Sequence, residues 1–249
     1  MKQTINMNKE RLFKKINPKF LEGIAHRGLH NERFTENGMN AFQNAIDHDV
    51  AFEFDIHITK DGELIVCHDE NLKRTTGKDG IIEHLTSKEI RDNYRLLDGG
   101  VVPTLQEVID LNNGRVPMVV ELKVFEKNYK PLATRAIEVL KQIENKRDVL
   151  LISFDPRSLW PLKKLGFIRS LLVAESDFYT WPFRHTVESI DIQDTLLNKP
   201  KVVRYAKRHF TNVWTIDSEE KLNKVLPYVD TVTYQFLDVK KVKDALINK

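Results

Sequence analysis

The sequence predicts an α/β protein, a TIM (β/α)₈ barrel with a small insertion after the second strand. Eight short apolar segments alternate with amphipathic ones, which is the pattern of parallel strands joined by helical crossovers. Segments such as Val149 to Asp155 are almost continuously apolar, as strands buried on both faces are. The length of 249 residues is typical of one such barrel. We therefore expect residues 1–249 to form a single domain; an open doubly wound sheet is the alternative that the pattern alone leaves open.

The eight expected strands are segments rich in β-branched, aliphatic and aromatic residues. In chain order they are Leu21 to Gly28, Ala51 to Thr59, Met118 to Val124, Val149 to Asp155, Arg169 to Ser176, Ser189 to Leu197, Thr211 to Asp217 and Val229 to Leu237.

Amphipathic segments follow most of these strands and are expected to be helices. In the first of them, the apolar residues recur at helical spacing and share one face. Asp155-Pro156 and Asp217-Ser218 are plausible helix starts, because Asp and Ser cap helices and Pro suits a first turn. The expected helices span 37–48, 129–144, 156–165, 200–210 and 218–228.

A long segment between the second and third expected strands interrupts the alternation. It begins with an apolar run, Glu63 to Asp69, that can pair with Ala51 to Thr59 across the Asp-Gly turn at Asp61-Gly62. We expect an insertion above the barrel over roughly residues 69–117. Residues 1–19 are expected to form a helix that closes the bottom of the barrel or packs on its side.

Composition excludes several classes of protein. The 39 basic and 36 acidic residues are well mixed and leave a net charge of +3, whereas a nucleic-acid-binding surface concentrates its basic residues. The single cysteine, Cys67, allows no intrachain disulfide. No apolar stretch approaches the ~18 residues of a membrane span. We expect a cytoplasmic protein with no nucleic-acid partner and no stable membrane anchor.

Ionisable residues gather where the expected strands end, which is the functional face of a barrel. Glu53 and Asp55 are two positions apart and therefore share one face of their strand. In a barrel that face is the interior, where unpaired carboxylates are costly and a cation would relieve the cost. The full set is His26, Arg27, Glu53, Asp55, His68, Glu121 and Lys123.

These residue types together indicate phosphoryl chemistry. Three carboxylates without paired Cys or His spacing suit a hard cation, Mg²⁺ or Ca²⁺. An Arg and a Lys beside such an ion would hold a phosphoryl oxygen. Two imidazoles can act as general acid and general base. Singly, His26 could be a hydrogen-bonded core histidine and Lys123 a surface partner of Glu121, but seven coincidences at strand ends are hard to explain as packing.

Several sequence motifs also resemble the glycerophosphodiester phosphodiesterase family, of the PLC-like phosphodiesterase superfamily. They run in family order along nearly the whole chain, and the combination of His-Arg-Gly, Glu-Asn, Glu-x-Asp, His-Asp and Glu-x-Lys is specific. The motifs are IAHRG, TEN, AFQNAI, FEFDIHITKDGELIVCHDENLKRTTG, PTLQEVI, VVELK, ISFD and WTID.

The resemblance implies hydrolysis of a small-molecule glycerophosphodiester to glycerol 3-phosphate and an alcohol, with one divalent cation, Mg²⁺ or Ca²⁺. It implies that a neighbouring glycerol hydroxyl attacks phosphorus and that water opens the cyclic intermediate. A homodimer is left open. By matching motif positions, the implied roles are metal binding for Glu53, Asp55 and Glu121, acid/base catalysis for His26 and His68, phosphate binding for Arg27 and Lys123, and pocket lining for Trp214.

The chain departs from the family pattern near its C-terminus. It has Trp214-Thr215-Ile216-Asp217 where the family usually reads Trp-Thr-Val-Asn, and Thr233 to Asp238 where a Thr-Asp-x-Pro pattern is usual. The alcohol is therefore open. Alternatives are a lysophospholipase D, or another phospholipase that acts on acylated glycerophospholipids, and a non-catalytic phosphate-ligand binding barrel.

Three further features are expected to lie near the pocket without carrying the chemistry. The aromatic loop at Tyr179 and Trp181-Pro182-Phe183 is a candidate lid or pocket wall. His57 shares the face of Glu53 and should lie near the pocket rim. Cys67 should point away from its neighbour His68, because adjacent strand residues face opposite ways, so a nucleophile is not expected there.

Overall fold

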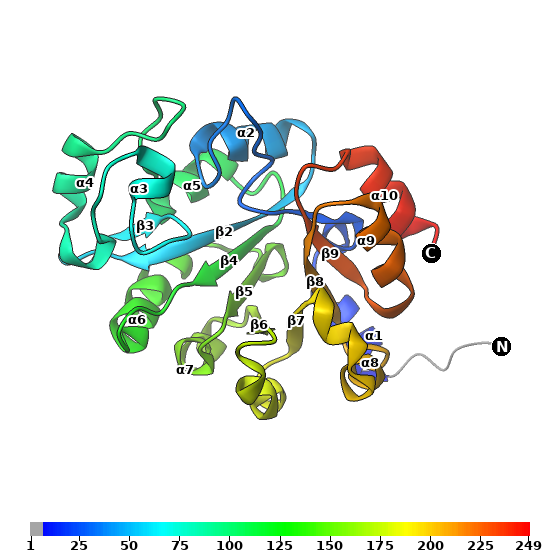
Figure 1. Ribbon diagram of the computed structural model, residues 1–249. Coiled ribbons are helices and arrows are strands. Elements are labelled where there is room, and N and C mark those ends of the chain that lie inside the picture. The colour runs from blue at the N-terminus through cyan, green and yellow to red at the C-terminus, as the bar shows by residue number, and fades with distance from the viewer. Residues whose placement is uncertain (1–6) are drawn as a thin grey trace.

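The computed structural model describes residues 7–249 and has the expected closed barrel (Figure 1). Eight parallel strands follow one another around it in the order β1, β2, β4, β5, β6, β7, β8, β9, and the pairing of β9 with β1 closes the sheet. Helices cover its outside, as parallel sheets require. The predicted TIM barrel is confirmed, and the open doubly wound sheet is excluded.

All eight expected strands are present, and most are one to four residues shorter than expected. A ninth strand, β3, pairs antiparallel with β2 and is the predicted hairpin. The strands are β1 Ile24–Ala25, β2 Ala51–Ile58, β3 Leu64–Val66, β4 Met118–Leu122, β5 Val149–Ser153, β6 Ile168–Val173, β7 Ser189–Gln193, β8 Thr211–Ile216 and β9 Thr231–Tyr234.

The expected helices are also present, and two of them begin at the caps that the sequence indicates. Asp155 accepts a hydrogen bond from the Arg157 amide, and Ser218 accepts one from the Lys221 amide. The α-helices are α1 Met7–Phe13, α2 Met39–Asp47, α3 Lys73–Thr76, α4 Ser87–Asn93, α5 Leu105–Asn112, α6 Tyr129–Leu140, α7 Pro156–Leu159, α8 Pro200–Ala206, α9 Glu219–Val225 and α10 Val239–Ile247.

Strand β1 has only two residues, although the sequence indicates eight, because the backbone turns on both sides of it. Gly23 has φ +106° before the strand, and Arg27 and Gly28 have φ +55° and +79° after it. At Gly28 a Cβ atom would lie 2.9 Å from the Ala41 backbone, so only glycine fits the crossing of this turn over helix α2. The turn aims the His-Arg pair at the barrel mouth instead of extending the strand.

The barrel has two apolar layers, which together decide where polar groups can lie. Outward-facing side chains such as Phe52 and Phe54 of β2 pack against the surrounding helices. Inward-facing Ala51 of β2 and Val119 of β4 join Leu12 and other residues of the N-terminal segment in a separate plug. Because this plug fills the N-terminal end, the inward positions farther along each strand are left for the functional face.

Residues beyond the β2–β3 hairpin form a small core of their own. Ile65, Cys67, Leu72, Ile90 and Val102 pack together apart from the barrel core, around α3 and α4. Helix α5 belongs instead to the ring around the barrel, where it packs beside α2 in the main core. Within the segment expected as an insertion, residues 69–117, the separate core therefore ends at Val102. Cys67 is buried there, away from the barrel, and burial raises the pKa of its thiol to about 12.

Across residues 7–249, no helix combines the length and the apolar character needed to cross a membrane.

The packing of α2 on β2 gives a first prediction. Phe42 stacks on Phe52 with ring centroids 5.0 Å apart and meets Phe54 edge-on at 5.5 Å, all fully buried. Replacing Phe42 with Ala leaves a cavity, and we expect it to lower the free energy of unfolding by about 3–5 kcal/mol in urea denaturation. The exposed change Asp47→Ala in the same helix should shift it by no more than about 0.5 kcal/mol. Equal effects of the two changes would contradict this account of the packing.

Candidate active site

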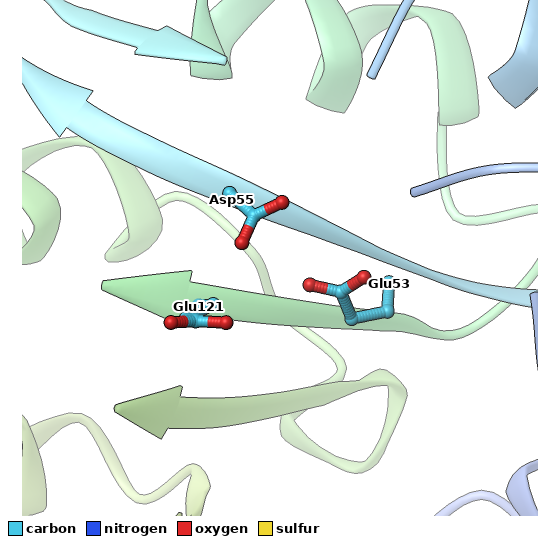
Figure 2. A group of neighbouring side chains, drawn as sticks. All are labelled: Glu53, Asp55 and Glu121. Atoms are coloured by element: carbon cyan, nitrogen blue, oxygen red, sulfur yellow. The ribbon is translucent and has the colours of Figure 1, made fainter. Parts of the chain in front are cut away.

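Three carboxylates meet at the C-terminal end of the barrel interior. Glu53 and Asp55 project from β2 and Glu121 from neighbouring β4 (Figure 2). One carboxylate oxygen of each lies within 4.8 Å of the others, and all three side chains are buried. Asp55 and Glu121 are register partners in the sheet, and Glu53 shares the inward face of Asp55 two positions earlier. Glu53 and Asp55 therefore face the barrel interior, as predicted.

Two cations and one amide lie against this cluster. Lys123 Nζ is 2.9 Å from Glu121 Oε1 and 3.5 Å from Asp55 Oδ1. Arg27 Nε is 3.7 Å from Asp55 Oδ2, and the Arg27 amide donates to Glu53 Oε2 at 3.0 Å. Asn37 Nδ2 donates to Asp55 Oδ2 at 2.9 Å. Both phosphate-binding candidates thus border the carboxylates.

The charges are not fully balanced. Burial disfavours ionised Asp55, but the positive charges of Lys123 and Arg27, together with the Asn37 hydrogen bond, outweigh burial and hold the Asp55 pKa below its ordinary value. Burial, followed by the charges of Asp55 and Glu121, raises the pKa of Glu53 well above its ordinary value. Burial and the Asp55 charge raise the pKa of Glu121 to about 7, despite Lys123.

The donor set fits a divalent cation. Asp55 Oδ1 is buried without a hydrogen-bond partner among the described residues, and burial beside a neighbouring carboxylate raises the pKa of both Glu53 and Glu121. Carboxylate oxygens are the ligands that hard divalent cations prefer. Glu53, Asp55 and Glu121 can therefore hold such an ion, which would supply the missing charge.

His26 follows β1 at the edge of the cluster. Its Nδ1 is 2.8 Å from Gln235 Oε1, which can only accept, so Nδ1 carries the proton and Nε2 is free to accept one. Burial and the charge of Arg27 lower the pKa of His26 to about 4, and the imidazole is neutral near pH 7. Gln235 lies in the last-strand region where this chain departs from the family pattern.

His68 follows β3, which pairs with the far end of β2 on the same edge as β1. Its Nδ1 is 2.7 Å from Asp69 Oδ1, and Asp69 is ionised because hydrogen bonds from Arg74 and His68 outweigh burial and lower the Asp69 pKa to about 2. Nδ1 therefore donates, and Nε2 is again the free acceptor. Burial lowers the pKa of His68 below its ordinary value.

A shell of ionic contacts holds these residues, and most of it was not predicted. Arg74 donates to Asp69 at 2.6 Å and to both oxygens of Glu36, at 2.7 and 2.8 Å. Glu36 also accepts from Arg27 at 2.7 Å, so one chain of contacts links Arg27 to the partner of His68. Glu36 and Asn37 belong to one quoted motif and Arg74 to another, but neither motif indicates that Arg74 bonds Glu36.

His57 lies where its strand parity placed it, on the inward side of β2 near the pocket rim. It is buried, its Nδ1 lies 2.6 Å from Glu83 Oε1, and its Nε2 lies 3.2 Å from the His68 carbonyl oxygen. It fixes the backbone that carries His68.

Two cavities share the candidate residues. An inner cavity of about 110 Å³ lies within the barrel mouth, and an outer one of about 540 Å³ opens beside it. His68, Glu121 and Phe154 line both. Trp214 lines the inner cavity and meets Phe154 edge-on, with ring centroids 5.7 Å apart. Seven of the eight predicted site residues thus line one or both cavities, and the eighth, Asp55, is buried beside Glu53 and Glu121.

The aromatic loop divides between these surroundings and the core. Tyr179 and Phe183 line the outer cavity and are exposed, as a pocket wall would be. Trp181 is buried and stacks on Phe178, so it anchors the loop to the barrel instead.

Comparison with known protein families gives a match over residues 26–239, to the model described as the glycerophosphoryl diester phosphodiesterase family. The chain belongs to this family. A glycerophosphodiester phosphodiesterase of Caldanaerobacter subterraneus is 28% identical over 220 residues, which cover 82% of this chain and 88% of that protein. A human lysophospholipase D is 39% identical over a shorter stretch of 104 residues, 41% of this chain and 32% of that protein.

Solved structures of the family share the fold. An Oleispira antarctica phosphodiesterase in complex with the product sn-glycerol-3-phosphate superposes with a TM-score of 0.76 and 24% identity, over 91% of this chain and 96% of that one. A putative glycerophosphoryl diester phosphodiesterase from Agrobacterium tumefaciens gives 0.78 and 20%, over 91% and 98%. The family assignment made from the motifs is therefore confirmed.

Binding of a divalent cation to the carboxylate cluster gives a second prediction. Mg²⁺ or Ca²⁺ added to EDTA-treated protein should raise its stability, by about 2.7 kcal/mol at a hundred times the dissociation constant. Glu53→Gln and Glu121→Gln should remove this gain in thermal unfolding, and the surface change Glu138→Gln should not. A full gain in both cluster variants would show that the ion binds elsewhere.

The raised carboxyl pKa values give a third prediction, for the metal-free protein. In the folded protein the Glu121 carboxyl holds its proton up to about pH 7, whereas its ordinary pKa is 4.5. The unfolded chain therefore releases this proton at lower pH, and the folded state loses stability relative to it as pH rises from 4.5 through 7. In EDTA the free energy of unfolding should fall between pH 5 and pH 8. Glu121→Gln should reduce this slope; an unchanged slope would mean that Glu121 ionises normally.

Proposed function

We propose that the protein hydrolyses glycerophosphodiesters to glycerol 3-phosphate and an alcohol, with Mg²⁺ or Ca²⁺ held by Glu53, Asp55 and Glu121. One observation carries the proposal: two imidazoles with free Nε2 atoms border a cluster of three buried carboxylates that Lys123 and Arg27 neutralise only in part. The reaction consumes one water molecule. Its hydroxyl becomes bound to phosphorus in glycerol 3-phosphate, and its proton is transferred to the oxygen of the released alcohol. A non-catalytic barrel would have no need of both neutral imidazoles.

His26 and His68 are suited to move protons on two sides of phosphorus. They follow β1 and β3, which pair with the beginning and the end of β2 along the same edge, so Glu53 and Asp55 lie between the two pairings. Both are neutral near pH 7, because burial lowers both pKa values. A neutral imidazole can accept the proton of an attacking hydroxyl, and a protonated one can return it to a leaving oxygen.

Arg27 and Lys123 are suited to hold the phosphate. Lys123 lines the outer cavity and Arg27 the inner one, so a phosphodiester at their junction would meet both. Each is held by carboxylates, which fixes its position before substrate arrives. When bound, a divalent ion would withdraw charge from the phosphoryl group.

A lysophospholipase D is the second candidate, and the outer cavity is the observation that favours it. Tyr179 and Phe183 are exposed on its wall, with Trp160, Phe154 and Val124 nearby. Exposed aromatics beside a catalytic pocket suit an acyl chain. The human relative noted above carries that activity in its name. A cytoplasmic location and a homodimer stay predictions.

The decisive assay follows product release, and gives a fourth prediction. Purified protein, treated with EDTA and then given Mg²⁺ or Ca²⁺, should release glycerol 3-phosphate from glycerophosphocholine or glycerophosphoethanolamine. Glu53→Ala should abolish release, and His26→Ala and His68→Ala should each lower kcat by about 10²–10⁴-fold. The exposed His48→Ala on α2 is the matched control and should keep full activity.

Two outcomes would redirect the assignment. Full activity in both His26→Ala and His68→Ala would overturn the acid/base roles. Turnover of dispersed lysophosphatidylcholine in place of the soluble diesters would favour the lysophospholipase D, and no turnover with either ion would favour the binding role.

A further inference from the structure

One side chain outside both cavities contacts the partners of two candidate site residues. Arg74 lies on the short helix α3, between Leu72, which is fully buried in the small separate core, and Thr75, which is also buried. The Leu72 amide donates to the Gly80 carbonyl oxygen at 2.9 Å. The Thr75 carbonyl oxygen accepts from the Leu97 amide at 2.9 Å, so the segment beyond the β2–β3 hairpin holds this helix on both sides. No step above uses Arg74, which lines neither cavity.

The guanidinium of Arg74 bridges two carboxylates. Its Nε donates to Asp69 Oδ2 at 2.6 Å, and its Nη1 and Nη2 donate to Glu36 Oε2 and Oε1 at 2.7 and 2.8 Å. A pair of parallel hydrogen bonds to one carboxylate restrains its orientation, which a single point charge does not. Arg74 therefore fixes Glu36 and Asp69 relative to each other, although they project from different loops.

Glu36 holds the guanidinium of Arg27. Arg27 Nη1 donates to Glu36 Oε1 at 2.7 Å, whereas Arg27 Nε has no hydrogen-bond partner among the described residues. Arg27 Nε lies 3.7 Å from Asp55 Oδ2, which is beyond hydrogen-bond distance. The direction of the Arg27 side chain therefore depends on Glu36, and Arg74 bonds both oxygens of Glu36.

His68 depends on Arg74 in the same way. Its Nδ1 bonds Asp69 Oδ1 at 2.7 Å, and the other oxygen of Asp69 accepts from Arg74. The Asp69 side chain is 31% exposed, so packing alone does not fix it. Arg74 thus supports a phosphate-binding candidate and a catalytic candidate, each through one carboxylate.

Folding stability alone does not distinguish this arginine from others near it. The Arg74 side chain is 46% exposed, and exposed ion pairs add little to stability. Arg91 on α4 is a close counterpart: its side chain is 40% exposed, and its Nη2 lies 2.6 Å from Glu107 Oε1. Glu107 caps helix α5 and lines neither cavity. The two arginines therefore differ in what their carboxylate partners hold.

We propose that Arg74 is a positioning residue that orients Arg27 through Glu36 and His68 through Asp69, so that the segment beyond the hairpin couples phosphate binding to proton transfer. The roles of Arg27 and His68 rest on the proposed function, but phosphate binding can be measured without turnover. A displacement of about 1 Å at a reacting group can cost about 10²-fold in rate, so Arg74 can affect catalysis without touching substrate.

The test measures binding of inorganic phosphate by calorimetry in saturating Mg²⁺, and kcat for glycerophosphocholine, on the full chain. Arg74→Ala should weaken phosphate binding about tenfold and lower kcat by about 10–10²-fold, and the matched control Arg91→Ala should leave both within about twofold. The two variants should melt at similar temperatures, because each loses one exposed arginine and its ion pairs. A melting temperature of Arg74→Ala far below that of Arg91→Ala would indicate a structural role and overturn the proposal.

Further variants separate the two contacts of Arg74. Glu36→Gln should weaken phosphate binding, and Asp69→Asn should lower kcat and leave phosphate binding unchanged. Arg74→Ala should have a smaller effect in either of these backgrounds than in the wild type, because the broken contact is shared. Arg74→Lys keeps the charge without the planar fork and should restore only part of the loss. Independent effects in the double variants, or full restoration by lysine, would contradict a positioning role.

Phosphate binding and turnover together separate this proposal from the broader one. If the wild type hydrolyses no diester but Arg74→Ala weakens phosphate binding in a way that depends on Glu36, the proposed function fails and the positioning of Arg27 stands. If diesters are hydrolysed and Arg74→Ala behaves as Arg91→Ala does in both measurements, the function stands and the positioning role fails. Wild-type protein that binds no phosphate would also overturn the positioning role.

Discussion

Three carboxylates share the buried end of β2 and β4, and their mutual repulsion constrains everything around them. One carboxylate oxygen each of Glu53, Asp55 and Glu121 lies within 4.8 Å of the others, and none of these residues is more than 7% exposed. Two cations border them, and Arg27 also neutralises Glu36, so positive charge falls short. Such an arrangement is costly for the apo fold and persists in proteins where it binds a cation. The cost is confined to one end because an apolar plug fills the other.

Hydrogen bonds and ion pairs connect this cluster to the side chains that would carry out the reaction. The Arg27 backbone turns with φ +55° just beyond β1, which lets its amide bond Glu53 while its side chain reaches Glu36. Glu36 passes the link through Arg74 to Asp69, which orients His68. Most of these side chains project from loops instead of strands. The ionic contacts therefore hold them in position, as the strand backbone does for Glu53.

The two cavities differ in size and in the residues that line them. The inner one is small and polar on both sides, whereas the outer one is larger and has exposed aromatic walls. A phosphodiester has two different arms, and under the proposed function its phosphate would lie between Arg27, which lines the inner cavity, and Lys123, which lines the outer one. Arms that differ in size and polarity can therefore be told apart by which cavity they enter, and the family fold permits this because the walls come from separate loops and strands.

The sequence by itself determined the barrel, the parity of Glu53 with Asp55 and the family, because these depend on local periodicity and on motifs a few residues long. The eight predicted site residues come together as expected. Only the tertiary structure decided what meets them: Arg74 reaches Glu36, Gln235 reaches His26 from the far end of the chain, β1 is cut short by its flanking turns, and α5 joins the barrel ring. Asp191 and Asn212 form a buried polar pair because β7 and β8 are neighbours in the barrel. In the sequence each is a single polar residue within an expected strand, and nothing there indicates that the two meet.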